Sequence, residues 1–295
     1  MSHSISISPK IKENESCFRE VFKDCADILF HTMELGRGKT VDCFVIYLEV
    51  AVSNMILEKS VLGKFINELC KVSGDEILER VEKNALGISD AVQLDTVEDV
   101  VAGVFAGDAV FFIDGYAHAV KISEKGYPSM GVSEADREKV LRGSKEGFTD
   151  SVKTNSALIR KRIRNPGMKV KEQTIGRRSQ TKIQILYIEG LARSEILEEL
   201  ETKLSDFEID GVLDSGVIEQ LIKENWLSPF PQFQTTERPD KCAMELLNGR
   251  VVLLVDNSPV GLLIPAVFND FLQVSEDEYQ TFELATFLRV LRYLA

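Results

Sequence analysis

Two apolar runs of strand length mark the centres of two similar halves of the chain. Residues 41–48 (VDCFVIYL) and 183–188 (IQILYI) are almost continuously apolar, which is typical of a central strand buried on both faces. Residues with the 3.6-residue spacing of an amphipathic helix follow each run. A strand candidate and then a turn precede each run, at 27–35 and 36–40 in the first half and at 168–175 and 176–180 in the second.

Caps and turn residues predict the remaining elements. Asn54, Thr96 and Ser194 are predicted to cap helices, and Pro239 is predicted to open one. The Asp-Gly pair at 114–115 predicts a tight hairpin. The predicted helices span 17–24, 54–69, 75–83, 96–106, 148–164, 194–204, 215–222, 239–247 and 276–294, and the predicted hairpin strands span 109–113, 116–122, 251–255 and 260–264. Residues 1–16 lack the pattern of a secretory signal and are predicted to be a disordered tail.

The two halves also align with each other. Gly36 aligns with Gly176 at an offset of 140 residues, and Asp114 aligns with Asp256 at an offset of 142. A repeat of both order and spacing favours a duplicated architecture. The alternative is the convergence of two common strand–helix units.

We therefore predict an α/β fold of two similar lobes, each a small mixed sheet with flanking helices, separated by a cleft. Clefts between lobes are common ligand sites. The predicted divisions are a tail with a short helix at 1–26, lobe 1 at 27–124, a connector at 125–147, lobe 2 at 148–275 and a C-terminal helix at 276–295.

Composition excludes several classes of protein. The net charge of −12 argues against a general nucleic-acid binder, which needs a positive footprint. The five cysteines are widely spread and form no CxxC pair, so we predict reduced thiols. The three histidines have no ligand spacing, and no nucleophile elbow, Walker loop or HExxH motif is present. No apolar run reaches the roughly 20 residues that span a bilayer. We predict a non-enzymatic protein with no metal site and no cofactor.

One strongly basic segment interrupts this acidic chain. Residues 137–182 hold 14 Lys and Arg side chains against 4 Asp and Glu, whereas the rest of the chain holds 21 against 43. Three interpretations stay open: a solvated basic face that pairs with the acidic remainder, a surface for an anion or polar ligand, and a contact with a membrane or partner. The candidate residues in this segment are Asn155, Arg162, Arg177 and Arg178.

A second polar cluster surrounds Pro239 and consists of Glu237, Arg238 and Asp240. A helix start explains it, because proline fits the first helical position and acids are favoured near the positive end of the helix dipole. The functional alternative is a polar cluster on the rim of the predicted cleft.

Several motifs together resemble a known family. They are RGSKEGF at 142–148, TNSALIRKRI at 154–163, IGRRSQT at 175–181, SPFPQFQTTERPDK at 228–241 and LRYLA at 291–295. In this order they resemble the A subunit of GerA-type spore germinant receptors of endospore-forming bacteria. The family's usual RGPREGF is RGSKEGF here, with Ser144 and Lys145 in place of proline and arginine. Lysine cannot make the planar bidentate contact that arginine makes.

The resemblance implies a location and partners. The family protein is a membrane subunit whose large soluble N-terminal region precedes its membrane helices, so this chain would be that region alone, on the cytoplasmic side of the spore inner membrane. The family senses small nutrients such as amino acids, sugars or nucleosides. The receptor contains B and C subunits, and A subunits are thought to oligomerise. The soluble region of the family is two lobes with a cleft.

Two functions are carried forward from the sequence. The first is a sensing and coupling domain in which the inter-lobe cleft recognises a small germinant. The candidate ligand-binding or inter-lobe residues match the family motifs and are Asn155, Arg162, Arg177, Arg178, Glu237, Arg238 and Asp240. The second is an oligomerisation scaffold that binds no nutrient, in which the basic segment packs on the acidic surface of an adjacent A subunit. Binding of a phosphate-rich polymer through residues 153–178 is a third hypothesis.

Overall fold

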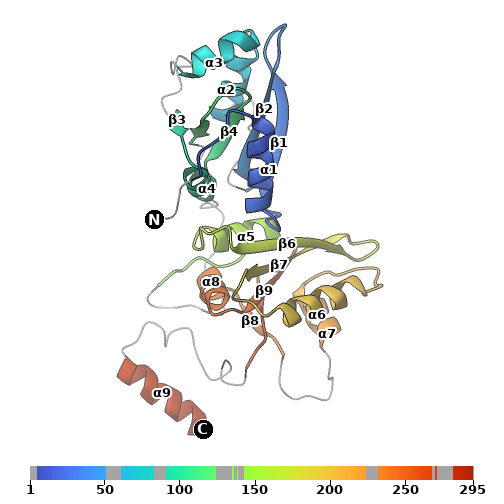
Figure 1. Ribbon diagram of the computed structural model, residues 1–295. Helices are drawn as coiled ribbons and strands as arrows, with labels where there is room; N and C mark the ends of the chain where they lie inside the picture. Colours follow the sequence, from blue (N-terminus) through green and yellow to red (C-terminus); the bar gives the residue numbers. More distant parts are fainter. Residues whose placement is uncertain are drawn as a thin grey trace. The chain divides into compact units, whose positions relative to one another are not determined.

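The chain forms two compact units in the computed structural model (Figure 1). The structure describes residues 5–50, 61–82, 91–123, 135, 138, 143–223, 232–267, 270 and 282–294. Lobe 1 comprises Met1–Pro128 with Arg164–Pro166, and lobe 2 comprises Ser129–Ile163 with Gly167–Ala295.

Lobe 1 contains a five-stranded antiparallel sheet with the order β1-β2-β4-β5-β3. Its strands are β1 (Ile28–Leu35), β2 (Val41–Leu48), β3 (Ala91–Leu94), β4 (Ala109–Ile113) and β5 (Ala119–Ile122), and its helices are α1 (Ile11–Val21), α2 (Val61–Leu69), α3 (Gly74–Glu82) and α4 (Val97–Phe105). Helices α1 and α4 cover one face of the sheet, and α2 and α3 cover the other.

Strand β2 is buried on both faces, as its continuous apolar run predicts. Phe44, Ile46 and Leu48 join the core under α1 and α4, whereas Cys43 and Val45 join the core under α2 and α3. Side chains of a strand alternate between faces, so a strand between two helical layers needs apolar residues at every position.

Lobe 2 repeats this architecture, with the strand order β6-β7-β9-β10-β8. Its strands are β6 (Met168–Ile175), β7 (Thr181–Ile188), β8 (Gln234–Thr236), β9 (Val251–Val255) and β10 (Gly261–Ile264), and its helices are α5 (Val152–Arg160), α6 (Ser194–Ser205), α7 (Ser215–Ile222), α8 (Pro239–Leu247) and α9 (Phe282–Leu294). Helices α5 and α8 share one apolar cluster with the sheet, and α6 and α7 share the other.

The predicted two-lobed α/β fold is confirmed, with one correction to the sheets. All the strand pairings of the described residues are antiparallel, so the sheets are not mixed. Hairpins join β1 to β2 and β6 to β7, which makes those pairs antiparallel. Two helices then lead from β2 to the edge strand β3, and from β7 to the edge strand β8.

The predicted disordered tail is wrong over the described residues 5–16. Helix α1 begins at Ile11 instead of near Cys17, and Ile7, Ile11 and Phe18 are buried in the core of lobe 1. The backbone N–H of Ile7 donates to the carbonyl oxygen of Asp95 at 3.1 Å. The many polar residues between these apolar positions form the solvent face of the helix.

Several local predictions are also corrected. Ser194 is the first residue of α6 and does not cap it. Helix α5 begins after Ser151, so Phe148 precedes the helix. Strand β5 begins at Ala119, so the connection from β4 is longer than the predicted two-residue turn. Within this connection the Asp114 carboxylate accepts from the backbone N–H of Ile11 at 3.0 Å. The short edge strands β3 and β8 escaped prediction.

Other predictions hold. Thr96 caps α4 by accepting from the N–H of Asp99 at 3.2 Å, and Pro239 is the first residue of α8. Gly115 has the positive φ (84°) that the turn requires. The predicted cap Asn54, Arg142, most of the connector at 125–147 and residues 276–281 lie outside the described residues. None of the described helices is both long and apolar enough to cross a bilayer.

Candidate functional site

Asn155 is a fully buried brace within lobe 2. Its Oδ1 accepts from the backbone N–H of Thr149 at 2.8 Å, and its Nδ2 donates to the carbonyl oxygen of Thr149 at 2.6 Å. Nδ2 also lies 3.5 Å from the carbonyl oxygen of Ser258. These bonds tie the segment before α5 to the β9–β10 connection and occupy the amide.

Lobe 1 contains the same brace at Asn14. Its Oδ1 accepts from the N–H of Ser8 at 2.9 Å, and its Nδ2 donates to the carbonyl oxygen of Ser8 at 2.6 Å. Both asparagines therefore bond to the residue six positions earlier. The same hydrogen-bond pattern therefore occurs in the first turn of α1 and of α5, where it ties each helix to the segment that precedes it.

Arg162 follows α5 and is held by a carboxylate. Its Nη2 donates to Glu146 at 2.6 Å and to the Ser144 hydroxyl at 2.9 Å, and its Nη1 donates to the carbonyl oxygen of Leu158 at 2.7 Å. Burial alone would raise the pKa of Glu146, but hydrogen bonds from Lys161 and Arg162 outweigh it and lower the pKa below its ordinary value. Glu146 is thus an anion that already has two cationic partners.

Arg177 and Arg178 lie on the exposed turn between β6 and β7. Arg177 pairs with Glu208 at 3.0 Å, and Arg178 lies 3.7 Å from Asp210. Their side chains are 69% and 85% exposed, so these pairs contribute little to stability. The turn packs against the segment between α6 and α7, because backbone N–H groups of both arginines donate to it.

Glu237, Arg238 and Asp240 surround the start of α8. The Arg238 side chain is 2% exposed and its guanidinium binds both carboxylate oxygens of Asp240. The backbone of Glu237 accepts from the N–H of Phe148 at 2.8 Å and donates to Glu138 at 3.0 Å. Pro239 and Asp240 are therefore explained by their positions in the first turn of α8. Arg238 is a buried cation that this interpretation does not explain.

The structure brings these residues together only in part. The Phe148–Glu237 bond joins the segment before α5 to the start of α8, and both helices lie on one face of the lobe 2 sheet. Arg177 and Arg178 lie at the turn beside the α6–α7 segment, away from that cluster. Their assignment to one ligand site stays a prediction, as does the inter-lobe cleft.

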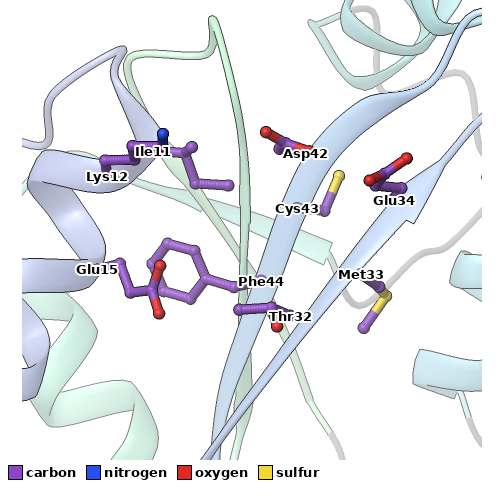
Figure 2. A pocket seen from close by; sticks show the side chains of 9 residues that line it. All are labelled: Ile11, Lys12, Glu15, Thr32, Met33, Glu34, Asp42, Cys43 and Phe44. Atoms are coloured by element: carbon purple, nitrogen blue, oxygen red, sulfur yellow. The ribbon is translucent and has the colours of Figure 1, made fainter.

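Sequence reasoning missed a pocket in lobe 1 between α1 and the β1–β2 hairpin (Figure 2). Its volume is about 560 Å³. Figure 2 shows Lys12 and Glu15 on the helix side, opposite Glu34 and Asp42 on the strands. The complete lining is Ile11, Lys12, Glu15, Thr32, Met33, Glu34, Asp42, Cys43 and Phe44. The pocket could not be predicted because the sequence pattern assigns residues 1–16, which supply Ile11, Lys12 and Glu15, to a disordered tail.

The pocket has no activated thiol. Burial, followed by the nearby charges of Asp42 and Asp114, raises the pKa of Cys43 to about 12. The thiol is therefore protonated at neutral pH and is a poor nucleophile. In the part of the chain that the structure describes, no group of three or more His, Cys, Asp and Glu residues could hold a metal ion.

Comparison with known proteins places the chain in a family. The family described as "Bacillus/Clostridium GerA spore germination protein" matches residues 16–295. The chain is 36% identical to the spore germination protein GerLA of Bacillus cereus, over 96% of this chain and 58% of that protein. It is 35% identical to the uncharacterized membrane protein YfkQ of Bacillus subtilis (strain 168), over 98% of this chain and 55% of that protein. The chain thus spans little more than half the length of these relatives.

A solved structure has the same fold. It is the crystal structure of the N-terminal domain of the A subunit of the Bacillus megaterium spore germinant receptor GerK3. The TM-score is 0.68 at 27% sequence identity, and the match covers 90% of this chain and 98% of that domain. The match therefore spans nearly the whole of both chains. The chain belongs to the GerA family of spore germination proteins.

Proposed function

We propose that this chain is the N-terminal domain of the A subunit of a spore nutrient germinant receptor, in which it senses a small germinant and couples it to the membrane region. The observation that supports this proposal best is the fold match with the GerK3 A-subunit domain over 98% of that domain. The partners would be the B and C subunits and other A subunits. The domain would lie on the cytoplasmic side of the spore inner membrane.

In this proposal the ligand site is the predicted cleft, with the residues of lobe 2 named above. Arg162 is 20% exposed beside Glu146, so its guanidinium keeps a limited solvent-facing edge. Arg177 and Arg178 are the most accessible cations of the set. A ligand that prefers one arrangement of the lobes over another would shift their populations by its difference in affinity.

An amide NMR titration of the whole chain tests the proposal. The probes are single amino acids, sugars and nucleosides. We expect one class to give saturable shifts at residues 155–178 and 237–240. Arg162→Ala combined with Arg177→Ala should abolish those shifts and slow germination of spores on that nutrient. The matched control is Arg37→Ala with Arg193→Ala, which removes two exposed arginines elsewhere.

The scaffold is the second candidate, and a specific observation favours it. Arg162 and Arg238 are already bound by the carboxylates of Glu146 and Asp240. A scaffold would give no nutrient shifts and a self-association that weakens with salt, because the Debye length falls from about 10 Å at 0.1 M to about 3 Å at 1 M. Absence of shifts with all probes, together with unchanged germination of the double variant, would overturn the sensing proposal.

A further inference from the structure

The elements that surround the lobe 1 pocket have counterparts in lobe 2. The β1–β2 and β6–β7 ladders have the same eight-pair register at an offset of 140 residues. Thr32 and Asp42 therefore correspond to Glu172 and Lys182. Helices α1 and α5 correspond through their asparagine braces and through the carboxylates of Asp114 and Asp256, which accept from the first N–H of each helix. The two lobes can thus be compared position by position.

In lobe 2, at the position that corresponds to the pocket, neighbouring side chains of the protein form hydrogen bonds with the carboxylate of Glu172. Glu172 accepts from Lys182 at 2.7 Å and from Gln184 at 2.9 Å. Burial alone would raise the pKa of Glu172, but these two bonds and the charges of Lys182 and Lys153 outweigh it and lower the pKa. The carboxylate of Glu172 is therefore already bound by two side chains of the same lobe.

In lobe 1 the charges are arranged differently. Thr32 and Phe44 replace the Glu172–Gln184 pair, and Asp42 stands where lobe 2 has Lys182. Asp42 lies directly opposite Glu34 on the neighbouring strand, and like charges at directly opposed positions destabilise a sheet. No ion pair of Glu34 or Asp42 is found within the described residues, where Glu34 accepts only from the Thr40 hydroxyl, at 3.2 Å.

The other charges of the pocket do not compensate for this pair. Glu15 is occupied by Arg19, whose Nη2 lies 2.7 Å from it. Lys12 is exposed on α1 and is the single cation among the lining residues. Phe44 and Ile11 are buried side chains that give the pocket an apolar floor. The pocket therefore combines an excess of negative charge with an apolar surface.

We propose that this pocket binds a small organic cation, a primary ammonium attached to a short apolar body. An ammonium has three donors and would bridge the Glu34 and Asp42 carboxylates, as the Lys182 ammonium engages Glu172 in lobe 2. The apolar body would cover Phe44 and Ile11. The volume of about 560 Å³ suits a molecule of this size, since ligand pockets measure about 300–1,000 Å³. The pocket is lined by lobe 1 residues alone, none of which belongs to the set predicted for the cleft, so this proposal does not depend on that set.

Two probes with the same leucine side chain test the proposal. Leucinamide carries the ammonium, and N-acetylleucinamide lacks it. At constant ionic strength, NMR titration of the whole chain should give saturable shifts of the amides of 32–34 and 42–44 with leucinamide only. Asp42→Lys, which copies lobe 2, should weaken this binding by at least about tenfold, or about 1.4 kcal/mol. The side chain of Asp42 is exposed, so the variant should fold.

Glu20→Lys is the matched control, because it makes the same change of charge at an exposed position of α1 outside the pocket lining. This variant should bind leucinamide as the natural chain does. The proposal is overturned by equal shifts with both probes, by shifts that do not saturate, or by equal weakening in the two variants. Shifts confined to residues 155–178 would support the predicted cleft and refute the lobe 1 site.

Discussion

At the scale of residues, a polar side chain in a basic segment need not face a ligand. Asn155 looks like a binding residue in the sequence because it lies among arginines and lysines. In the fold it is buried and satisfies backbone groups that would otherwise lose their hydrogen bonds. A buried polar group without a hydrogen-bond partner costs more free energy than one formed hydrogen bond contributes to stability. The hydrogen bonds to Thr149 therefore account for an asparagine at position 155 without a ligand.

We expect Asn155→Ala to destabilise lobe 2 by about 1–3 kcal/mol, because it leaves the N–H and carbonyl groups of Thr149 without their side-chain partner. Hydrogen exchange of the β6–β7 amides measures the change within that lobe. Asn248→Ala removes the same side chain from an exposed position and should cost no more than about 0.5 kcal/mol. Unchanged protection in Asn155→Ala, combined with a loss of nutrient shifts, would instead support a ligand role.

At the scale of elements, α1 is an integral part of lobe 1. Phe18 is fully buried, and its ring centroid lies 5.1 Å from that of Phe112 on β4. Phe112 in turn stacks on Phe44 at 4.4 Å. These aromatic contacts connect the helix to two central strands. The helix also forms one wall of the pocket in Figure 2.

Phe18→Ala should destabilise lobe 1 by about 3–5 kcal/mol, the usual cost of truncating a buried phenylalanine. The measurement is hydrogen exchange of the β1 and β2 amides as denaturant is raised. Glu20→Ala, two residues further along on the exposed face, serves as the control and should leave that protection unchanged. Equal hydrogen-exchange protection in both variants would mean that α1 does not contribute to the hydrophobic core of lobe 1.

At the scale of the whole molecule, the two lobes share one backbone architecture but differ in their charged side chains. Both lobes share strand order, the register of the first hairpin and the asparagine brace. They differ where α1 or α5 faces that hairpin: lobe 2 has the Glu172–Lys182 pair and lobe 1 has the Glu34–Asp42 carboxylates. Backbone architecture therefore places the same positions together in both lobes, and side chains decide what each place can bind.

The Glu172 pair predicts a dependence of stability on pH. A carboxyl whose pKa is lowered on folding adds stability above its unfolded pKa, and that stability is lost as the pH falls through the folded pKa. The unfolded value is near 4.5. Glu172→Gln should thus reduce the unfolding free energy at pH 7, and the difference from the natural chain should shrink as the pH falls below 4.5.

Urea unfolding across this range of pH, followed by the amides of lobe 2, measures the effect. Glu195→Gln is the control at an exposed position of α6 and should follow the natural chain throughout. A difference between Glu172→Gln and the natural chain that stays constant with pH would show that the pair does not stabilise the fold through its charge.

The sequence by itself determined the two-lobed α/β architecture, since strongly apolar central strands such as 41–48 and the repeat at 140 residues are local or periodic signals. It also determined the family, through short motifs that each consist of neighbouring residues. It could not predict β3 and β8, because edge strands of three or four residues pair only after the sheet exists. It also assigned the first half of α1, before Cys17, to a disordered tail, because one buried stripe in a polar segment is a weak signal.

Only the tertiary structure decided which polar residues are free to bind. Asn155 and Arg162 are engaged by partners distant in sequence, Ser258 and Glu146, and Arg238 is engaged by Asp240. The pocket of lobe 1 brings together residues of α1, β1 and β2 that lie up to 33 positions apart, from Ile11 to Phe44. Charge and hydrogen-bonding partners act across space, so the sequence names the side chains but the packing of the sheet and its helices decides which of them meet.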